Sequence, residues 1–244
     1  MTNQRTALGD FMSILNRGAR CAVPVMFATA LAAWGDSETN QRKSFIKFLD
    51  DINSRAGVHY LVPTPTDEKA FGPYLQQYVI ILDFNKDMKA RMDEFVAQIM
   101  KLGYGPTSTS RTIEQIAAAP QDLLAAKDAV NKMGQDIEME LAKVNAERTA
   151  LKQPDDLKVV YDKTFERLVT TPALAMKKSA TAFDVAIDAS MKLADYINSH
   201  RNKLSVTGIQ IQAKDQRTLD EIRPLLKAQQ DAGERFQAAQ RNVR

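Results

Sequence analysis

The two histidines and the aspartate pair after Pro154 are the residues of this chain whose types suggest chemistry. His59 stands in a segment broken by prolines, and His200 falls at the predicted end of a helix. Neither has a second ligand close in sequence, and an imidazolium at a helix C-terminus is favoured by the helix dipole alone. Asp155 and Asp156 follow Pro154, which is typical of acidic residues in the first turn of a helix. We therefore expect no catalytic, cofactor-binding or metal-binding residue, and no cofactor.

The carboxylates leave one alternative open. None of their spacings distinguishes a site from an ordinary solvated helix face. The sequence has no glycine-rich phosphate loop, HExxH or GxSxG, which are common motifs of nucleotide, zinc and serine-nucleophile sites. The alternative function is an enzyme or small-ligand binder with a carboxylate-lined site that no motif reveals. Two or more carboxylates, or a histidine with a carboxylate, converging in a closed pocket would favour it.

The N-terminal segment has the features of a bacterial export signal. An uncharged run of 14 residues, Cys21 to Trp34, follows Arg17 and Arg20 and gives way to polar residues. It is shorter than the roughly 20 residues that a membrane-crossing helix needs. Cleavage after Ala30 or Ala32 would fit a signal peptidase, which prefers small residues. The competing interpretation is an N-terminal amphipathic or buried helix of a cytosolic protein.

Lipid modification is not expected. The triplet Leu31-Ala32-Ala33 is that of a lipoprotein signal, but Trp34 follows where the modified cysteine would stand. Cys21, the sole cysteine, lies within the signal, so the exported part forms no disulfide and depends on packing for its stability. We thus divide the chain into residues 1–34, the export signal, and residues 35–244, a single helical domain.

Net charge excludes one class of partner. The chain carries +3, but residues 1–34 hold three arginines and one aspartate, which leaves 30 basic and 29 acidic residues beyond them. Nucleic-acid binding needs a clustered basic surface. We therefore expect no nucleic-acid partner.

Apolar residues beyond Ser37 recur with the helical period almost everywhere. The first helix is expected to end near Gly57, and a second to begin with Thr66 as its N-cap, to be reset at Pro73 and to end at Leu102. A short helix over 113–118 and a long helix from Pro120 to Leu151 come next.

That long helix contains a regular heptad pattern. Apolar residues recur every seven positions, at Leu123, Val130, Ile137, Val144 and Leu151. Such a seam requires a helical partner, either in the same chain or in another. Each heptad of a coiled coil has a second apolar position, and together the two positions form the seam. Here Glu140 and Glu147 occupy this second position, where a two-chain coiled coil would favour leucine. The pattern therefore favours an antiparallel neighbour within one bundle.

The remaining elements complete a helical fold. A helix opens at Pro154 and is expected to close at Thr170-Thr171-Pro172, and the next runs to His200 with Leu174 among its buried residues. Alternation with period two over 204–212 predicts a small hairpin. A last helix, from Asp215 to Ala239, is expected to break or bend at Pro224. The predicted fold is all-α, an elongated bundle of five to six long helices with one hairpin-like segment.

Several segments in the same order resemble a known family. They are QRKSFIKFL at 41–49, FGP at 71–73, LKQPDDLK at 151–158, VTTP at 169–172, DYI at 195–197 and GIQ at 208–210. Together they resemble the YiaF-like family of Gram-negative envelope lipoproteins, classed as domain of unknown function 3053. The resemblance covers most of residues 35–240 and implies an exported helical protein without established chemistry. Members end the signal with a lipidated cysteine, and this chain departs from that pattern at Trp34.

These observations together predict an uncharacterised bacterial cell-envelope protein. We expect a structural or interaction protein, a scaffold or adaptor, that faces the periplasm and binds an unidentified envelope protein. It is expected to be periplasmic or membrane-associated, and to reach the outer membrane if lipidated. The family resemblance implies membrane association through a lipid anchor.

Overall fold

The computed structural model describes residues 34–56, 61–102 and 111–241. The chain divides into two units, residues 1–37 and 38–244. Of the first unit only residues 34–37 are described, and they form the beginning of helix α2, Trp34–Ser54. All other described residues belong to the second unit. Cys21, His59 and both expected cleavage positions lie outside the described residues.

Helix α3, Pro65–Phe71, begins two residues earlier than the sequence predicted. The N-cap is Thr64 rather than Thr66: its Oγ1 accepts a hydrogen bond from Asp67 N at 3.2 Å, and Thr64 N donates to Asp67 Oδ2 at 2.9 Å. Pro65 occupies the first helical position, where its missing N–H costs nothing. The prediction of Thr66 as the N-cap was wrong because it placed Pro65 in the loop before the helix, whereas Pro65 is the first residue of the helix.

The expected second helix is divided by Gly72. Helix α3 gives way to a 3₁₀ turn, Gly72–Tyr74, and then to α4, Leu75–Lys101. Gly72 has a φ of 53°, a region that residues with a side chain rarely occupy. The predicted reset near Pro73 is therefore confirmed, with the glycine supplying the change of direction.

The next two predicted helices have nearly the expected bounds. Helix α5 is Ile113–Ala118, with Thr112 in a capping box with Gln115. Helix α6 is Pro120–Ala150. Ala119, with φ −132° and ψ 63°, is the single residue between them.

The predicted break at Thr170 to Pro172 was wrong. Helix α7, Asp155–Phe165, continues through a π-helical segment, Glu166–Thr170, into α8, Thr171–Ser199. Pro172 lies in the first turn of α8. Thr171 N donates to the Glu166 carbonyl five residues back, which is the π-helical hydrogen bond, and Pro172 directly after it has no N–H to donate.

The hairpin and the last helix agree closely with the prediction. Strands β1, Leu204–Thr207, and β2, Gln210–Ala213, pair antiparallel with Leu204 opposite Ala213. Gly208, with φ 60°, provides the tight turn. Helix α9, Gln216–Arg241, continues through Pro224, so of the two predicted outcomes the break does not occur, and the bend stays a prediction.

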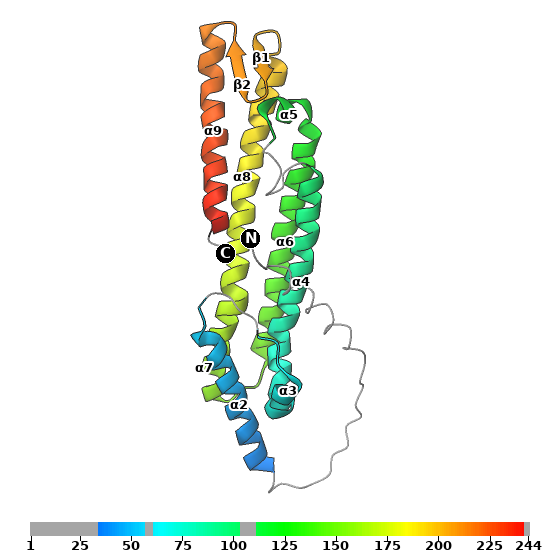
Figure 1. Cartoon of the computed structure of the whole chain (residues 1–244), viewed down its shortest axis with the longest axis vertical. Helices are drawn as coiled ribbons and strands as arrows, with labels where there is room; N and C mark the ends of the chain where they lie inside the picture. Colours follow the sequence, from blue (N-terminus) through cyan, green and yellow to red (C-terminus); the bar gives the residue numbers. More distant parts are fainter. Residues whose placement is uncertain (1–33, 57–60, 103–110, 242–244) are drawn as a thin grey trace, which may run out of the picture. The chain divides into compact units, whose positions relative to one another are not determined.

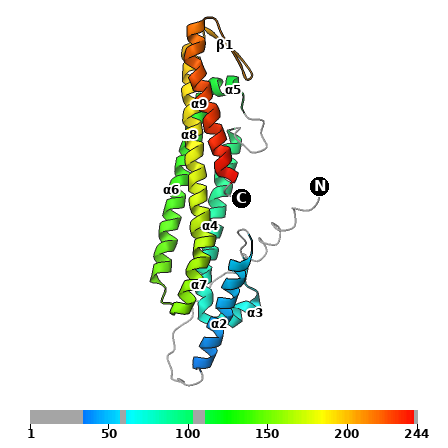
Figure 2. The same ribbon diagram turned by 90° about the vertical axis from the view of Figure 1, so that its left-hand side faces the viewer.

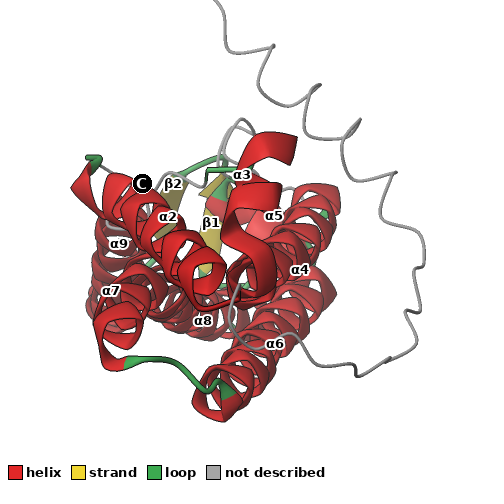
Figure 3. Cartoon of the chain, turned by 90° about the horizontal axis from the view of Figure 1, so that it is seen from below, coloured by secondary structure: helices red, strands yellow, loops and turns green. Residues whose placement is uncertain are grey.

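The four long helices α4, α6, α8 and α9 pack in succession. Helix α6 packs against both α4 and α8, and α9 packs against α8 (Figures 1 and 2). Phe183 of α8 joins three of them: its ring is T-shaped to Phe95 of α4 at 6.5 Å and stacked on Phe236 of α9 at 4.6 Å. Figure 3 shows the four helices side by side from below. The predicted all-α fold with one small hairpin is confirmed.

The predicted α6 seam is buried from Leu123 to Val144, and its partners belong to the same chain. Leu151 is only half-buried and is the C-cap of α6, and Glu147 is exposed, so the last part of the predicted seam was wrong. Residues at both seam positions are buried against α4 and α8: Leu123, Ala126, Val130, Met133, Ile137, Glu140 and Val144. Leu174 is different, because 52% of its surface is exposed although we predicted it to be buried. It lies in the first turn of α8, on a part of that helix that the other described helices leave open.

A second part of the core joins α2, α3 and α7 to α4. Phe45, Tyr78 and Tyr161 are completely buried there. The Tyr161 hydroxyl donates to the Gln77 carbonyl at 2.7 Å, and burial raises the pKa of Tyr161. No helix among the described residues is both long and apolar enough to cross a membrane.

Candidate functional sites

His200 lies at the C-terminal end of α8 and is the histidine that falls within the described residues. Its ring stacks on Tyr196 with centroids 4.1 Å apart, and Nδ1 lies 2.9 Å from the Tyr196 carbonyl oxygen. The Tyr196 hydroxyl in turn donates to Glu221 Oε2 at 2.8 Å. These contacts cap a helix end and attach α9 to it.

Asp155 and Asp156 lie in the first turn of α7, as the sequence indicated. Asp156 Oδ1 accepts from Leu157 N at 2.9 Å, and Oδ2 lies 3.4 Å from Arg42 Nε of α2. The first contact satisfies an N–H of the helix N-terminus, and the second joins α7 to α2. The pair therefore serves the fold in the way that the first-turn interpretation predicted.

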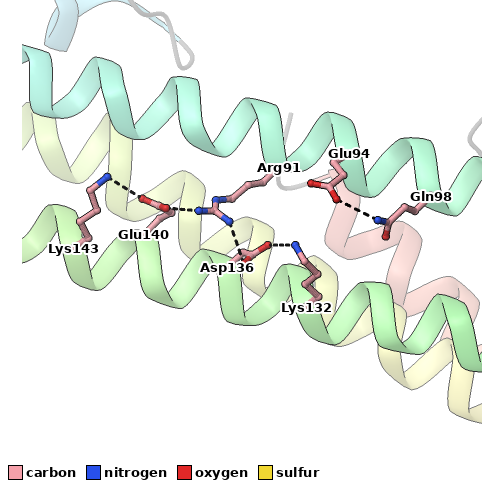
Figure 4. Close-up of polar contacts among 7 residues, drawn as sticks. All are labelled: Arg91, Glu94, Gln98, Lys132, Asp136, Glu140 and Lys143. Carbon is pink, nitrogen blue, oxygen red and sulfur yellow. Dashed lines mark hydrogen bonds and ion pairs between the residues drawn. The ribbon is translucent and has the colours of Figure 1, made fainter.

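The structure brings together a charged cluster that sequence reasoning missed, between α4 and α6 (Figure 4). Arg91 of α4 contacts two carboxylates one helical turn apart on α6. Its Nη2 lies 2.5 Å from Glu140 Oε1, and its Nη1 lies 3.1 Å from Asp136 Oδ1. The carboxylate side chains are 10% and 9% exposed, so these charges are taken largely out of water.

Two lysines complete the α4–α6 cluster. Lys132 Nζ lies 2.9 Å from Asp136, and Lys143 Nζ lies 3.5 Å from Glu140. Hydrogen bonding from Lys132 and the charge of Arg91 lower the pKa of Asp136, and the hydrogen bond to Glu140 raises the pKa of Arg91. Glu140 at a seam position was the available signal, since a buried charge requires a partner.

The cluster has little room for a ligand. The space beside Arg91, Asp136, Phe95 and their neighbours measures about 10 Å³, which is about the volume needed for a single water. Each carboxylate is already paired with two cations. Over the described parts of the chain, no three His, Cys, Asp or Glu side chains group closely enough to hold a metal ion.

A larger groove lies between α8 and α9. Its volume is about 430 Å³, and its lining consists of Leu174, Lys177, Lys178, Thr181, Ala182 and Val185 of α8 with Arg235 of α9. Leu174 and Val185, two large apolar side chains of this lining, are 52% and 44% exposed. The groove therefore combines apolar surface with three cationic side chains.

The cations of this groove differ in their pairing. Lys177 Nζ lies 2.5 Å from Glu138 of α6. Within the described ranges, Lys178 and Arg235 have no carboxylate at ion-pair distance. Because no acidic side chain lines the groove, its surface has an uncompensated positive charge.

Comparison with known proteins gives relatives without a described activity. A family model described as protein of unknown function, DUF3053, matches residues 21–244. Over 194 residues the chain is 26% identical to the Uncharacterized protein YiaF of Escherichia coli K12, and the match covers 79% of this chain and 80% of that protein. The same values apply to proteins of that name from Escherichia coli O157:H7 and Shigella flexneri. No solved structure matches the chain significantly.

Proposed function

This chain belongs to the DUF3053 family of proteins of unknown function, and from that premise we propose that it is an exported envelope protein that acts by binding a partner protein, not by catalysis. Its role is that of a scaffold or adaptor whose helices present the binding surface.

The α8–α9 groove is the observation that supports a binding role. Single exposed apolar side chains are common on protein surfaces. Leu174 and Val185 instead line one groove, together with cations that have no acidic neighbour there. Grouped apolar surface with charged neighbours is typical of protein interaction sites.

Catalysis by the Asp136 and Glu140 carboxylates is the competing function, and the geometry argues against it. A general base needs a free lone pair within hydrogen-bond reach of its substrate. Arg91, Lys132 and Lys143 occupy the two carboxylates, and the adjoining space measures about 10 Å³. The cluster instead suits a structural role, in which buried charges fix how α4 and α6 align.

Sequence features outside the described residues support export. The apolar run from Cys21 follows two arginines and ends with small residues, which together form the pattern of a signal peptide. Trp34 at the position of the lipid-modified cysteine supports a chain that reaches the periplasm without an acyl anchor.

Crosslinking in intact cells tests this function. A tagged chain is crosslinked in the envelope, captured under denaturing conditions and analysed by mass spectrometry. We expect a protein partner that is recovered equally with wild type and with the Asp136→Asn/Glu140→Gln variant. Recovery of uncrosslinked chain alone from envelopes would contradict the proposal. A second result would also contradict the proposal: an Asp136→Asn/Glu140→Gln variant that folds and binds the partner but no longer performs the function of the protein in the cell. Such a variant would assign the function to the carboxylates and not to binding.

A further inference from the structure

Helix α8 presents a stripe with coiled-coil spacing that no described helix covers. Leu174, Lys178, Thr181 and Val185 succeed one another at intervals of four, three and four residues. All four are exposed. Residues at such intervals share one helix face and pack against another helix. The stripe therefore has the spacing of a helix-packing surface without a helix on it.

The position of α9 explains why this stripe is open. Phe236 of α9 stacks on Phe183 of α8, and the Tyr196 hydroxyl of α8 lies 3.5 Å from the Thr218 carbonyl oxygen of α9. These contacts place the two helices antiparallel, with α9 beside the C-terminal half of α8 (Figures 1 and 2). Arg235, close to the end of α9, therefore forms one wall of the groove, and the α8 stripe forms the other.

Charge indicates the chemistry of the missing occupant. Lys178 lies within the stripe and Arg235 lies across the groove from it, and neither has a carboxylate partner among the described residues. An occupant with apolar residues along its centre and acidic residues along its edges would bury Leu174 and Val185 and pair both cations. Oppositely charged edges are how coiled-coil neighbours select one another.

The shape favours a helix over a lipid surface. A bilayer is flat and is bound by apolar side chains that protrude from a surface helix. Here the apolar residues line a groove with walls from two helices. Grooves of this kind bind amphipathic helices through anchors spaced by three and four residues.

We propose that the α8–α9 groove binds an acidic amphipathic helix of a partner protein, packed along Leu174, Thr181 and Val185 with its carboxylates paired to Lys178 and Arg235. This inference rests on the proposed binding function and names the surface and the partner chemistry.

Synthetic helical peptides test the groove directly. The probe is a panel of labelled peptides with leucine at heptad positions and glutamate on both flanks, and its matched version has lysine in place of each glutamate. Fluorescence anisotropy with the full chain is expected to show binding of the glutamate peptides at least about tenfold tighter than the lysine peptides. Vesicles of phosphatidylglycerol and phosphatidylcholine provide the lipid comparison.

Substitutions locate the binding. Leu174→Asn and Lys178→Glu should each weaken binding of the glutamate peptides by about tenfold or more. Leu124→Asn, at the same 52% exposure on α6, and Lys192→Glu, on an exposed part of α8, are the matched controls and should leave it unchanged. The Lys178→Glu/Arg235→Glu variant should reverse the preference and bind the lysine peptides. Circular dichroism melts verify that each variant is folded.

Three results would overturn the inference: equal binding of the two peptide types, equal effects of the groove and control substitutions, or groove-dependent binding to the vesicles with none to the peptides. The proposed binding function would survive any of them if envelope crosslinking still captured a partner. Capture that persists in the groove variants would mean that the partner binds another surface.

Discussion

Arg91 and Glu140 connect two neighbouring long helices through a contact of 2.5 Å between Nη2 and Oε1. The same guanidinium also binds Asp136, so one cation from α4 bridges two carboxylates of α6 that are almost completely buried. Their charges require this partner, because an ionised group is far less stable out of water than in it. The arrangement therefore fixes the alignment of α4 with α6.

Removal of Arg91 tests this dependence. Arg91→Met should lower the free energy of unfolding by about 3 kcal/mol, because it leaves buried carboxylates with only the two lysines as partners. Urea denaturation of the variant provides the measurement. Arg91→Met/Asp136→Leu/Glu140→Leu should recover most of the loss, since apolar residues of similar size replace buried ion pairs at little cost. An unchanged single variant would contradict the structural role.

Acid sensitivity should depend on Asp136. Its pKa is lowered by the hydrogen bond from Lys132 and by Arg91, so the ionised carboxylate stabilises the folded state. That contribution is fully present above the unfolded-state pKa of about 3.9 and is lost as the pH falls through the lower folded-state pKa. The stability gap between wild type and Asp136→Asn should be largest near neutral pH and narrow below about pH 4. Urea denaturation of both proteins across this pH range measures the gap. A gap that does not change with pH would contradict the role of the ionised Asp136.

Two glycines should respond to alanine with opposite signs. Gly72 has a positive φ, and an added Cβ would lie 2.5 Å from Gln41 Cδ, so Gly72→Ala should destabilise the fold by about 1 kcal/mol or more. Gly134 lies inside α6 with no atom within 4 Å of an added Cβ. Gly134→Ala should therefore stabilise by about 0.5–1 kcal/mol. Thermal melts that move in the same direction would refute this account of the turn.

The α6 seam provides a test of the predicted packing. Ile137 is 1% exposed, so Ile137→Asp should destabilise by several kcal/mol through a buried carboxylate without a partner. Glu138, one residue along, has a side chain that is 58% exposed and pairs with Lys177. Glu138→Gln should change stability by less than about 1 kcal/mol. Similar losses in urea denaturation would mean that α6 packs with a different face inward.

The helices and the hairpin were predictable because they depend on local patterns. The heptad of α6, the acids that open α7 and the alternation before and after Gly208 each involve residues close in sequence. The cap of α3 was misplaced for a local reason too: Thr64 and Thr66 both precede acidic residues, and only the geometry shows which one accepts from Asp67.

Contacts between distant segments could not be predicted. Arg91 and Glu140 are separated by 49 residues, and nothing in the α4 sequence selects this arginine from its other charged residues. Leu174 was expected to be buried because its spacing fits the helical period. It is 52% exposed and lines the groove beside Arg235 of α9, and the periodicity of α8 does not encode which helix packs beside it.

Export is the claim on which the proposed location and partner class depend, and mass spectrometry of the mature N-terminus tests it most directly. We predict that the chain is recovered from the periplasmic or membrane fraction without an acyl group, either cleaved after Ala30 or Ala32 or with its signal retained. Trp34→Cys completes a Leu-Ala-Ala-Cys sequence, and this variant should incorporate labelled palmitate and bind the membrane, at about 0.8 kcal/mol per buried methylene. Recovery of the uncleaved wild-type chain from the cytoplasm, acylation of that chain, or absence of acylation in the variant would contradict the account.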